Sequence, residues 1–227
     1  MKILITSGGT TENIDAVRGI TNHATGTLGK EVAECFLAQG HDVTLVTTQR
    51  AVKPKKHSKL KIVLVETVAD LIAELEPLVK THDAIIHSMA VSDYTPVYMT
   101  DLEEVEKAPA VKDLLHKSNT SAKISSQQDY QVLFLKKTPK VISLIKQWNP
   151  DIMLIGFKLL VGVPKEELLA VARRSLATNQ AHYIVANDLT TIDDNQHLAY
   201  LVGKDDVVVA KTKKAIAELI LERVTHD

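Results

Sequence analysis

The sequence predicts an α/β fold, in which a doubly wound, mostly parallel, Rossmann-like sheet forms one domain over residues 1–227. Three observations support this prediction. Short apolar runs rich in β-branched residues recur, as is typical of buried parallel strands. Helical periodicities lie between several of these runs, and 227 residues fit one large domain. The expected strands are 2–6, 42–47, 61–66, 84–87, 152–157 and 183–186.

The helices expected between these strands have apolar faces and recognisable ends. Thr67 and Asp70 have the spacing of a capping box, in which side-chain oxygens accept from free main-chain N–H groups at a helix start. Alternating strands and helices place helices on both faces of the sheet, and the ligand site beyond the carboxyl ends of the strands. The expected helices pass through residues 28–36, 68–80, 166–176 and 213–224.

Two regions interrupt this alternation. Residues 95–126 are polar and charged and contain Pro96 and Pro109, so we expect a long loop that is either a lid or disordered. The apolar runs 197–202 and 207–211 flank Gly203, which predicts a C-terminal β-hairpin before the last helix. The apolar edge of this hairpin, residues 197–211, could add strands to a second copy across a two-fold axis. Packing of the hairpin against its own last helix is the alternative.

Composition and charge exclude several classes of protein. The net charge is −1 with both signs interspersed, so no basic field predicts nucleic-acid binding. No window approaches the roughly 20 apolar residues of a membrane helix, so no membrane contact is expected. No signal peptide precedes the first strand, and the single cysteine cannot form an internal disulfide. We therefore expect a cytoplasmic protein.

Small and polar residues follow four of the expected strands. Because the carboxyl ends of parallel strands meet at one edge, we expect these residues to line one ligand site. Gly8 and Gly9 let main-chain N–H groups approach an anion, although an ordinary turn is the alternative. Gly26 and Gly29 similarly permit a tight start of the first helix with an anion at its N-terminus. Close packing of this helix against the sheet is the alternative. The four groups are Ser7–Thr10, His87–Tyr94, Gly156–Lys158 and Ala186–Asp188.

The motifs of several enzyme classes are absent. The pattern G-x-G-x-x-G does not occur around Gly26, and no acidic residue ends the strand 42–47. Arg50 after that strand keeps an NADP-dependent Rossmann reductase as one alternative. A non-enzymatic sensor of phosphometabolites or nucleotides is another, since a fold does not fix a function. No zinc motif, nucleophile elbow or P-loop occurs in the sequence.

A polar segment separates Gly9 from Gly26, so the first helix starts later than a simple glycine turn predicts. This segment brings Asp15, Arg18 and Asn22 to the mouth of the sheet. An asparagine can hydrogen-bond a carboxylate or phosphate oxygen without adding charge. The alternative is a loop with an Asp15–Arg18 surface pair, which would contribute little stability.

Six motifs follow one another along the chain: Ser7-Gly-Gly-Thr10; Asp15-x-x-Arg18-x-Ile20-x-Asn22-x-x-x-Gly26-x-x-Gly29; Ala90-Val91-x-Asp93-Tyr94; Lys123-Ile124; Gly156-Phe157-Lys158; and Ala186-Asn187-Asp188. Together they resemble phosphopantothenate–cysteine ligase (phosphopantothenoylcysteine synthetase) of coenzyme A biosynthesis, from about residue 2 to beyond 220. In many bacteria this domain follows a flavin-containing decarboxylase. Nothing of that half is present, so the chain looks like the stand-alone bacterial form, and we expect no flavin.

The resemblance implies a ligase that joins 4′-phosphopantothenate and L-cysteine. Relatives in this family dimerise, so the resemblance also implies a homodimer with the hairpin 197–211 as its contact. Members of the family activate the carboxylate with a nucleoside triphosphate, CTP in most bacteria, and release pyrophosphate. The cysteine amine then attacks the acyl-cytidylate and releases CMP. The resemblance also implies Mg²⁺, carried by the nucleotide phosphates, to neutralise their charge as the leaving group forms.

The resemblance also implies roles for individual residues. Asn22 matches the asparagine that holds the acyl-nucleotide, and Lys123 matches a lid lysine that offsets charge at the phosphates. Both are expected to be catalytic. Substrate contacts are implied for Arg18, Asn22, Gly26 and Ala90. Nucleotide contacts are implied for Ser7, Gly8, Gly9, Thr10, His87, Ser88, Met89, Asp93, Lys123, Thr138, Pro139, Lys140, Val141, Phe157, Asn187 and Asp188.

The sequence departs from the family on the helix before Asn187. Bacterial members usually have two lysines there that face the triphosphate, and here Ser175 and Asn179 stand in their places. Arg173 and Arg174 lie beside the first position. Eukaryotic relatives use ATP, so this departure concerns which nucleotide the protein uses. CTP remains the expectation.

Overall fold

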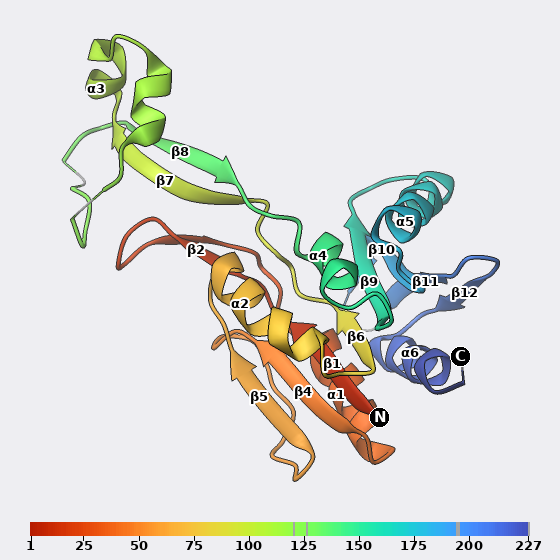
Figure 1. Cartoon of the computed structure of the whole chain (residues 1–227). Coiled ribbons are helices and arrows are strands. Elements are labelled where there is room, and N and C mark those ends of the chain that lie inside the picture. Colours follow the sequence, from red (N-terminus) through yellow and green to blue (C-terminus); the bar gives the residue numbers. More distant parts are fainter. Residues whose placement is uncertain (120, 126, 194–195, 227) are drawn as a thin grey trace.

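The computed structural model describes residues 1–119, 121–125, 127–193 and 196–226 (Figure 1). Its centre is an eight-stranded sheet with the order β12-β11-β10-β9-β6-β1-β4-β5. Neighbouring strands from β5 to β10 run parallel, whereas β11 and β12 are antiparallel. The predicted doubly wound, mostly parallel sheet is confirmed. The strands are β1 Lys2–Ser7, β4 Asp42–Thr47, β5 Leu60–Leu64, β6 Ala84–His87, β9 Met153–Leu160, β10 Tyr183–Ile192, β11 His197–Val202 and β12 Val207–Ala210.

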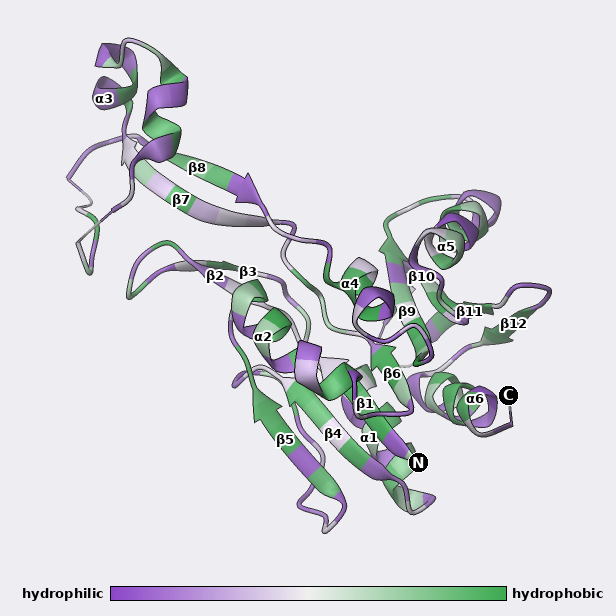
Figure 2. Ribbon diagram, in the orientation of Figure 1, coloured by the Kyte–Doolittle hydropathy of each residue, from purple (hydrophilic) through white to green (hydrophobic). Residues whose placement is uncertain are grey.

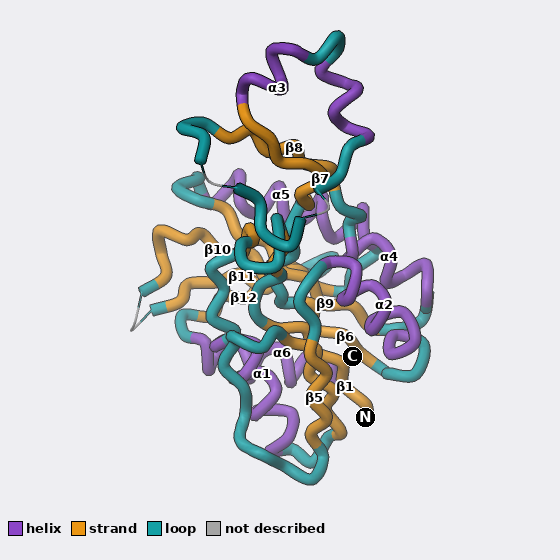
Figure 3. The backbone as a smooth tube through the Cα atoms, turned by 90° about the vertical axis from the view of Figure 1, so that its left-hand side faces the viewer, coloured by secondary structure: helices purple, strands orange, loops and turns teal. Residues whose placement is uncertain are grey.

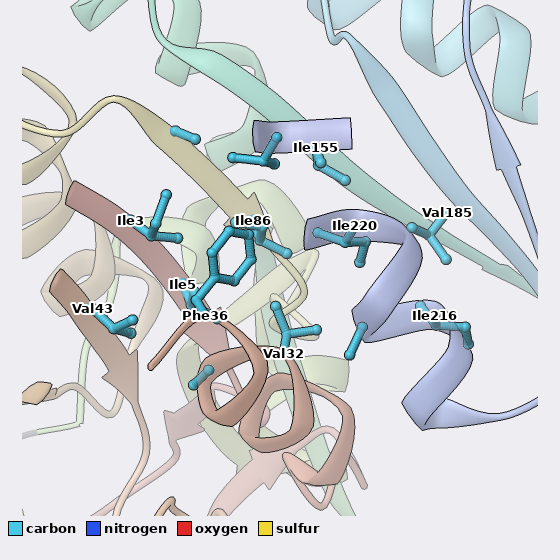
Figure 4. Close-up of a cluster of buried hydrophobic side chains, with 14 of the residues drawn as sticks. Ile3, Ile5, Val32, Phe36, Val43, Ile86, Ile155, Val185, Ile216 and Ile220 are labelled. Carbon is cyan, nitrogen blue, oxygen red and sulfur yellow. The ribbon is translucent and has the colours of Figure 1, made fainter. Parts of the chain in front are cut away.

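Helices cover both faces of the sheet because successive residues of a strand point to opposite faces. Ile3 and Ile5 of β1 face α1 and α6, whereas Leu4 between them belongs to the core under α2, α4 and α5. Figure 4 shows the first of these cores, with Phe36 of α1 beside Ile5 and Ile86. The helices are α1 Thr27–Ala38, α2 Val68–Val79, α4 Val141–Trp148, α5 Lys165–Asn179 and α6 Lys213–His226.

Most of the predicted elements form where the sequence places them. The Thr67 hydroxyl accepts a hydrogen bond from the Asp70 main-chain N–H (3.1 Å), and the Asp70 carboxylate accepts from that of Thr67 (3.0 Å). This reciprocal pair confirms the predicted capping box of α2. Helix α4 was not predicted: it spans only eight residues and has no side-chain cap.

The region expected to be a long loop is instead a folded arm. Two antiparallel strands, β7 (Tyr94–Asp101) and β8 (Gln131–Lys137), carry helix α3 (Leu102–Lys107) and a 3₁₀ helix, η1 (Val111–His116), at their far end. The arm projects away from the central sheet in both views (Figures 1 and 3). The loop prediction is therefore corrected for residues 95–116. Its last expected residue, Ser126, lies outside the described residues.

Side chains within the arm explain why it folds. The Tyr98 ring stacks on Phe134 with ring centroids 6.3 Å apart. Glu104 accepts from the Tyr98 hydroxyl (2.9 Å) and from the Lys117 ammonium (2.5 Å). The half-buried positions of the arm mix polar and apolar residues, as the pale and purple patches of β7 and β8 show (Figure 2). This mixed pattern hid the strands from a search for apolar runs.

The polar segment after β1 forms a small antiparallel hairpin of β2 (Thr11–Asn13) and β3 (Gly19–Thr21). Strand β2 contacts β7 at the base of the arm. Strands of three residues are too short for a periodic signal, so the sequence did not predict them. This hairpin explains the late start of the first helix.

The C-terminal hairpin of β11 and β12 packs against its own last helix. Ala199, Leu201 and Ala210 share a core with Ile216 and Ile220 of α6. This observation supports one of the two alternatives, and a dimer contact along the outer edge of β12 remains a prediction. Among the described residues, no helix combines the length and apolar character that crossing a membrane would require.

Candidate active site

The turn after β1 is shaped by glycines. Gly26, which precedes α1, has a φ of +79°, and its main-chain oxygen accepts from the Ser7 hydroxyl (3.1 Å). A Cβ on Gly9 would lie 2.7 Å from the main-chain oxygen of Asn22. Only glycine therefore lets the chain return from β3 directly against this turn. The return places Asn22 at the carboxyl edge of the sheet.

Main-chain bonds join the turn after β1 to the turn after β6. The Ala90 N–H donates a hydrogen bond to the Gly8 main-chain oxygen (2.9 Å), and the Thr10 N–H donates to the Ala90 main-chain oxygen (3.0 Å). The Asn22 amide crosses the same junction, since Nδ2 donates to the Ala90 oxygen (3.2 Å) and to Ser92 Oγ (3.3 Å). Thr10 is fully buried and binds Ser92, so it supports the junction from behind.

Three hollows lie along this edge of the sheet. The Asn22 hollow, of about 610 Å³, is lined by residues that include Gly9, Asn22 and Arg50. The α1 hollow, of about 420 Å³, lies at the start of α1, and the α4–α5 hollow, of about 520 Å³, lies between those helices. Residues 23–25 line the first two, and Met89, Phe157 and Lys158 line the last two. The hollows therefore adjoin in a row.

Most of the expected nucleotide contacts line two of these hollows, whereas Gly9 lines the Asn22 hollow. Ser7, Gly8, Ser88 and Asn187 line the α1 hollow, together with Gly26 and Ala90, two of the expected substrate contacts. His87, Asp93, Pro139, Lys140 and Val141 line the α4–α5 hollow. Thr138 lies beside the latter, where its hydroxyl donates to the Ser92 oxygen (2.5 Å).

Charge in the α4–α5 hollow comes from both signs. The Lys140 ammonium lies 2.6 Å from the Asp93 carboxylate, and both side chains are exposed, so the two groups are free to exchange this pair for a ligand. Arg174 and Ser175 of α5 also line the hollow. Asn179 is buried and accepts from Ser143 of α4 (2.9 Å), so this position fastens two helices together.

Two buried polar atoms in the α1 hollow have no hydrogen-bond partner among the described residues. Asn187 and His197 are more than nine-tenths buried, and Asn187 Nδ2 lies 3.2 Å from His197 Nε2. Within the described residues, Asn187 Oδ1 and His197 Nδ1 make no hydrogen bond. Burial and the nearby Lys213 lower the pKa of His197 to about 4, so its ring is neutral. Both side chains line the hollow and offer it polar contacts.

His87 ends β6 inside the protein. Its ring is buried, with Nδ1 2.9 Å from the Thr6 hydroxyl. Burial lowers the pKa of His87 to about 4, so it also stays neutral at pH 7.

Five of the predicted site residues lie outside the lining of the three hollows: Thr10, Arg18, Lys123, Thr138 and Asp188. Asp188 accepts from the main-chain N–H groups of Gly162 (3.0 Å) and Val163 (2.8 Å), and from Thr190. These hydrogen bonds, that of the Thr190 hydroxyl first, hold the pKa of Asp188 well below its usual range. Asp188 therefore orients the loop after β9. Arg18 and Lys123 lie together at the tip of the β2–β3 hairpin, where Arg18 pairs with Asp15 (2.6 Å).

Sequence reasoning missed several residues of these hollows. His197 and Lys213 line the α1 hollow because β11 and α6 return to the sheet edge, which no local pattern announces. Lys158 was quoted within a motif but given no role, although it lines two hollows. Its position next to Phe157 in the Gly156–Lys158 motif was the available signal, although β9 continues to Leu160 beyond the expected strand end at residue 157.

The model of the DNA/pantothenate metabolism flavoprotein C-terminal domain family matches residues 1–107 and 98–226. The chain belongs to this family. It is 30% identical over 225 residues to the coenzyme A biosynthesis bifunctional protein CoaBC of Thermococcus kodakarensis, a match that covers 98% of this chain and 50% of that protein. The chain thus spans about half the length of the curated relatives it matches.

Solved structures of the DNA/pantothenate metabolism flavoprotein family share the fold. The crystal structure of the DNA/pantothenate metabolism flavoprotein from Streptococcus pneumoniae has a TM-score of 0.95 at 55% identity, covering 99% of this chain and 98% of that chain. A Cab2 variant in complex with phosphopantothenate-cysteine has a TM-score of 0.74 at 21% identity, covering 99% of this chain and 86% of that chain. The latter likeness concerns the fold alone.

Proposed function

We propose that this chain is a phosphopantothenate–cysteine ligase. It would join 4′-phosphopantothenate and L-cysteine to form 4′-phosphopantothenoylcysteine in coenzyme A biosynthesis. Membership of the family and the relation to CoaBC support this proposal. The structural observation that carries it is the position of Asn22, a neutral amide held at the junction of two strand ends beside a row of three hollows.

The row of hollows suits two extended reactants that meet at their ends. In the first step, a carboxylate oxygen of phosphopantothenate attacks the α-phosphorus of the nucleotide, and pyrophosphate leaves. In the second step, the cysteine amine attacks the acyl carbon, loses a proton and displaces the nucleoside monophosphate. We place the nucleotide in the α1 and α4–α5 hollows and the pantothenate arm beside Asn22 and Ala90.

Asn22 would act in the second step through its carbonyl oxygen. Its Nδ2 donates to Ala90 and Ser92, and the described residues offer its Oδ1 no hydrogen-bond donor. The free Oδ1 can accept from the incoming cysteine amine and direct it towards the acyl carbon. Lys123, on the segment before β8, would approach the phosphates and offset their charge.

CTP is the proposed nucleotide, and Mg²⁺ the proposed metal. The described residues gather no group of three or more His, Cys, Asp or Glu side chains that could hold a metal ion. We therefore assign Mg²⁺ to the nucleotide phosphates, where it neutralises charge. Lys140, Lys158 and Arg174 line the α4–α5 hollow and would contact those phosphates.

We also propose a homodimer in the cytoplasm. Val209 of the edge strand β12 is exposed, and an open strand edge can pair with a second copy across a two-fold axis. The single cysteine suits a reducing compartment.

One incubation tests the proposed reaction. Purified protein, Mg²⁺, phosphopantothenate, cysteine and CTP are mixed, and pyrophosphate and the amide product are measured by coupled assay and mass spectrometry. We expect both products in equal amounts, and neither when phosphopantothenate is omitted. Absence of pyrophosphate together with NADPH binding would favour the reductase. Nucleotide binding without turnover would favour the sensor.

A further inference from the structure

The tip of the β2–β3 hairpin grips the chain on both sides of Lys123. The Asp15 carboxylate accepts from the Ile124 N–H (3.1 Å), and the Arg18 guanidinium donates to the Ile124 oxygen (3.0 Å). The Ala16 N–H donates to the Ala122 oxygen (2.9 Å). Three main-chain groups of residues 122–124 are thus bound by a hairpin more than 100 residues earlier, as the separation of 109 between Asp15 and Ile124 shows.

We propose that Asp15 and Arg18 are positioning residues that hold Lys123 for the reaction, an inference that rests on the proposed ligase function. We call the hydrogen bonds between residues 15–18 and residues 122–124 the latch. The proposal gives a role to Asp15, and it assigns Arg18 to the latch in place of a direct substrate contact.

The Asp15 residue is half-buried, but its carboxylate is shielded from solvent by its hydrogen-bond partners. Its side chain is 1% exposed, and its carboxylate accepts from the main-chain N–H groups of Val17 (2.9 Å), Arg18 (2.8 Å) and Ile124 (3.1 Å). Arg18 adds a two-pronged contact through Nε (3.0 Å) and Nη2 (2.6 Å). A buried carboxylate with partners on all sides is rigid, and losing one partner costs more than at a surface pair.

The latch matters because the segment it holds has no other regular structure. Residues 117–119, 121–125 and 127–130 join η1 to β8 without a helix or strand. A lysine that offsets developing charge must be held in place, since a misplacement of about 1 Å can cost roughly 10²-fold in rate. Fixing the peptide groups on either side of Lys123 fixes its Cα.

The latch also links the two residues that the proposed reaction uses. Strand β3 begins directly after Arg18 and ends at Thr21, and Asn22 is the next residue. The β2–β3 hairpin therefore carries Asn22 at its base and holds Lys123 at its tip. A change at the tip should displace Lys123, while the hydrogen bonds of Asn22 to Ala90 and Ser92 remain.

A double-mutant cycle tests the latch. Asp15→Asn keeps the shape of the side chain and removes its charge, and we expect pyrophosphate formation to slow by about 10-fold to 100-fold. Adding Asp15→Asn to Lys123→Gln should slow the reaction by less than about 2-fold further, because the latch acts only through Lys123. Arg18→Lys keeps the charge but loses the fork, and it should behave like Asp15→Asn. Glu76→Gln, which breaks an exposed ion pair of α2, is the matched control.

Amide hydrogen exchange provides a second measurement that does not depend on activity. Peptides that contain residues 122–124 should exchange at least about 10-fold faster in Asp15→Asn than in the unmodified protein, with core peptides unchanged. Independent, multiplicative losses in the double mutant would overturn the proposal, as would unchanged exchange at residues 122–124. If the unmodified protein forms no pyrophosphate, the ligase proposal and the role in catalysis fall together, while exchange still decides whether the contact exists.

Discussion

The side-chain amide of Asn22 donates a hydrogen bond to the main-chain oxygen of Ala90 over 3.2 Å, although 68 residues separate them. This bond directs Nδ2 of the amide towards the Ala90 main chain and leaves Oδ1 for the proposed ligand. It ties the segment after β3 to the turn after β6. A side chain that can only accept hydrogen bonds cannot make this bond. Replacing the Asn22 Nδ2 group by an oxygen is therefore enough to remove it.

We expect Asn22→Asp to form the acyl-nucleotide but to stall before the amide product. The new carboxylate would face the Ala90 oxygen without a proton to donate, and its charge would oppose the acyl-phosphate oxygens. Mass spectrometry of the quenched reaction should show the acyl-nucleotide accumulating. Turnover at the rate of the unmodified protein would contradict the role given to Asn22.

Lys123→Gln should reduce pyrophosphate release by about 10²-fold or more, the scale of losing one electrostatic stabiliser. Lys123 is exposed, so thermal stability should change little. Lys112→Gln, on an exposed lysine of η1, serves as the control for charge in the same arm. A Lys123→Gln protein that melts early but keeps its activity per folded molecule would rule out an electrostatic role.

The nucleotide is expected to be CTP, preferred over ATP by at least about 10-fold in kcat/KM, or about 1.4 kcal/mol. A site that hydrogen-bonds the edge of cytosine leaves those groups unpaired when adenine enters. Competition between CTP and ATP in one tube, read from CMP and AMP, measures the preference. A product that is mainly AMP would reverse the assignment.

Ser175→Lys should lower KM for CTP and ATP together, because Ser175 lines the α4–α5 hollow and the two nucleotides carry the same triphosphate group. Asn179→Lys should instead destabilise the protein. Asn179 is buried and binds Ser143, so a lysine there would lose that bond and bury a charge. Thermal melting beside steady-state kinetics separates the two effects. Equal behaviour of the two variants would contradict this reading of α5.

His87 should make the fold less stable in mild acid. Its pKa is about 4 in the folded protein and 6.5 when unperturbed, so between these values the unfolded chain binds a proton that the folded chain does not. The free energy of unfolding therefore falls as the pH drops from about 6.5 towards 4. This group should contribute a loss of about 2 kcal/mol between pH 7 and pH 5.

Urea unfolding at pH 7 and pH 5 measures this contribution. His87→Gln should lose less stability over that interval than the unmodified protein, whereas His116→Gln, on an exposed ring, should lose as much. Identical pH dependence in His87→Gln and the unmodified protein would show that His87 does not titrate in this way.

The central sheet was predictable because most of its inner strands are buried on both faces. Such strands are short apolar runs, and β4 and β6 match the expected residues 42–47 and 84–87. The arm was not predictable, since β7 and β8 are two half-buried strands that mix polar and apolar residues. Pro96 and the charges of α3 pointed to a loop.

The candidate site was predictable where motifs follow strands. Residues after β1 and β6 line the hollows, and so do Phe157 and Lys158 within the carboxyl half of β9, because topology alone brings these strand ends together. Contacts between distant segments gave no signal. Asp15 holds Ile124, and His197 meets Asn187, only after the whole sheet has formed.

Helix α6 shares a core with helix α1, although almost the whole described chain lies between them. During synthesis, the apolar face of α1 around Val32 and Phe36 emerges long before Ile216 and Ile220 exist to cover it. At about 5–20 residues per second, that face waits on the order of ten seconds or more. The nascent chain must therefore expose the apolar face of α1 to the cell. A ribosome that stops before Lys213 releases a product in which this face has no helix to cover it. Chaperones that bind such surfaces are expected to meet this chain early.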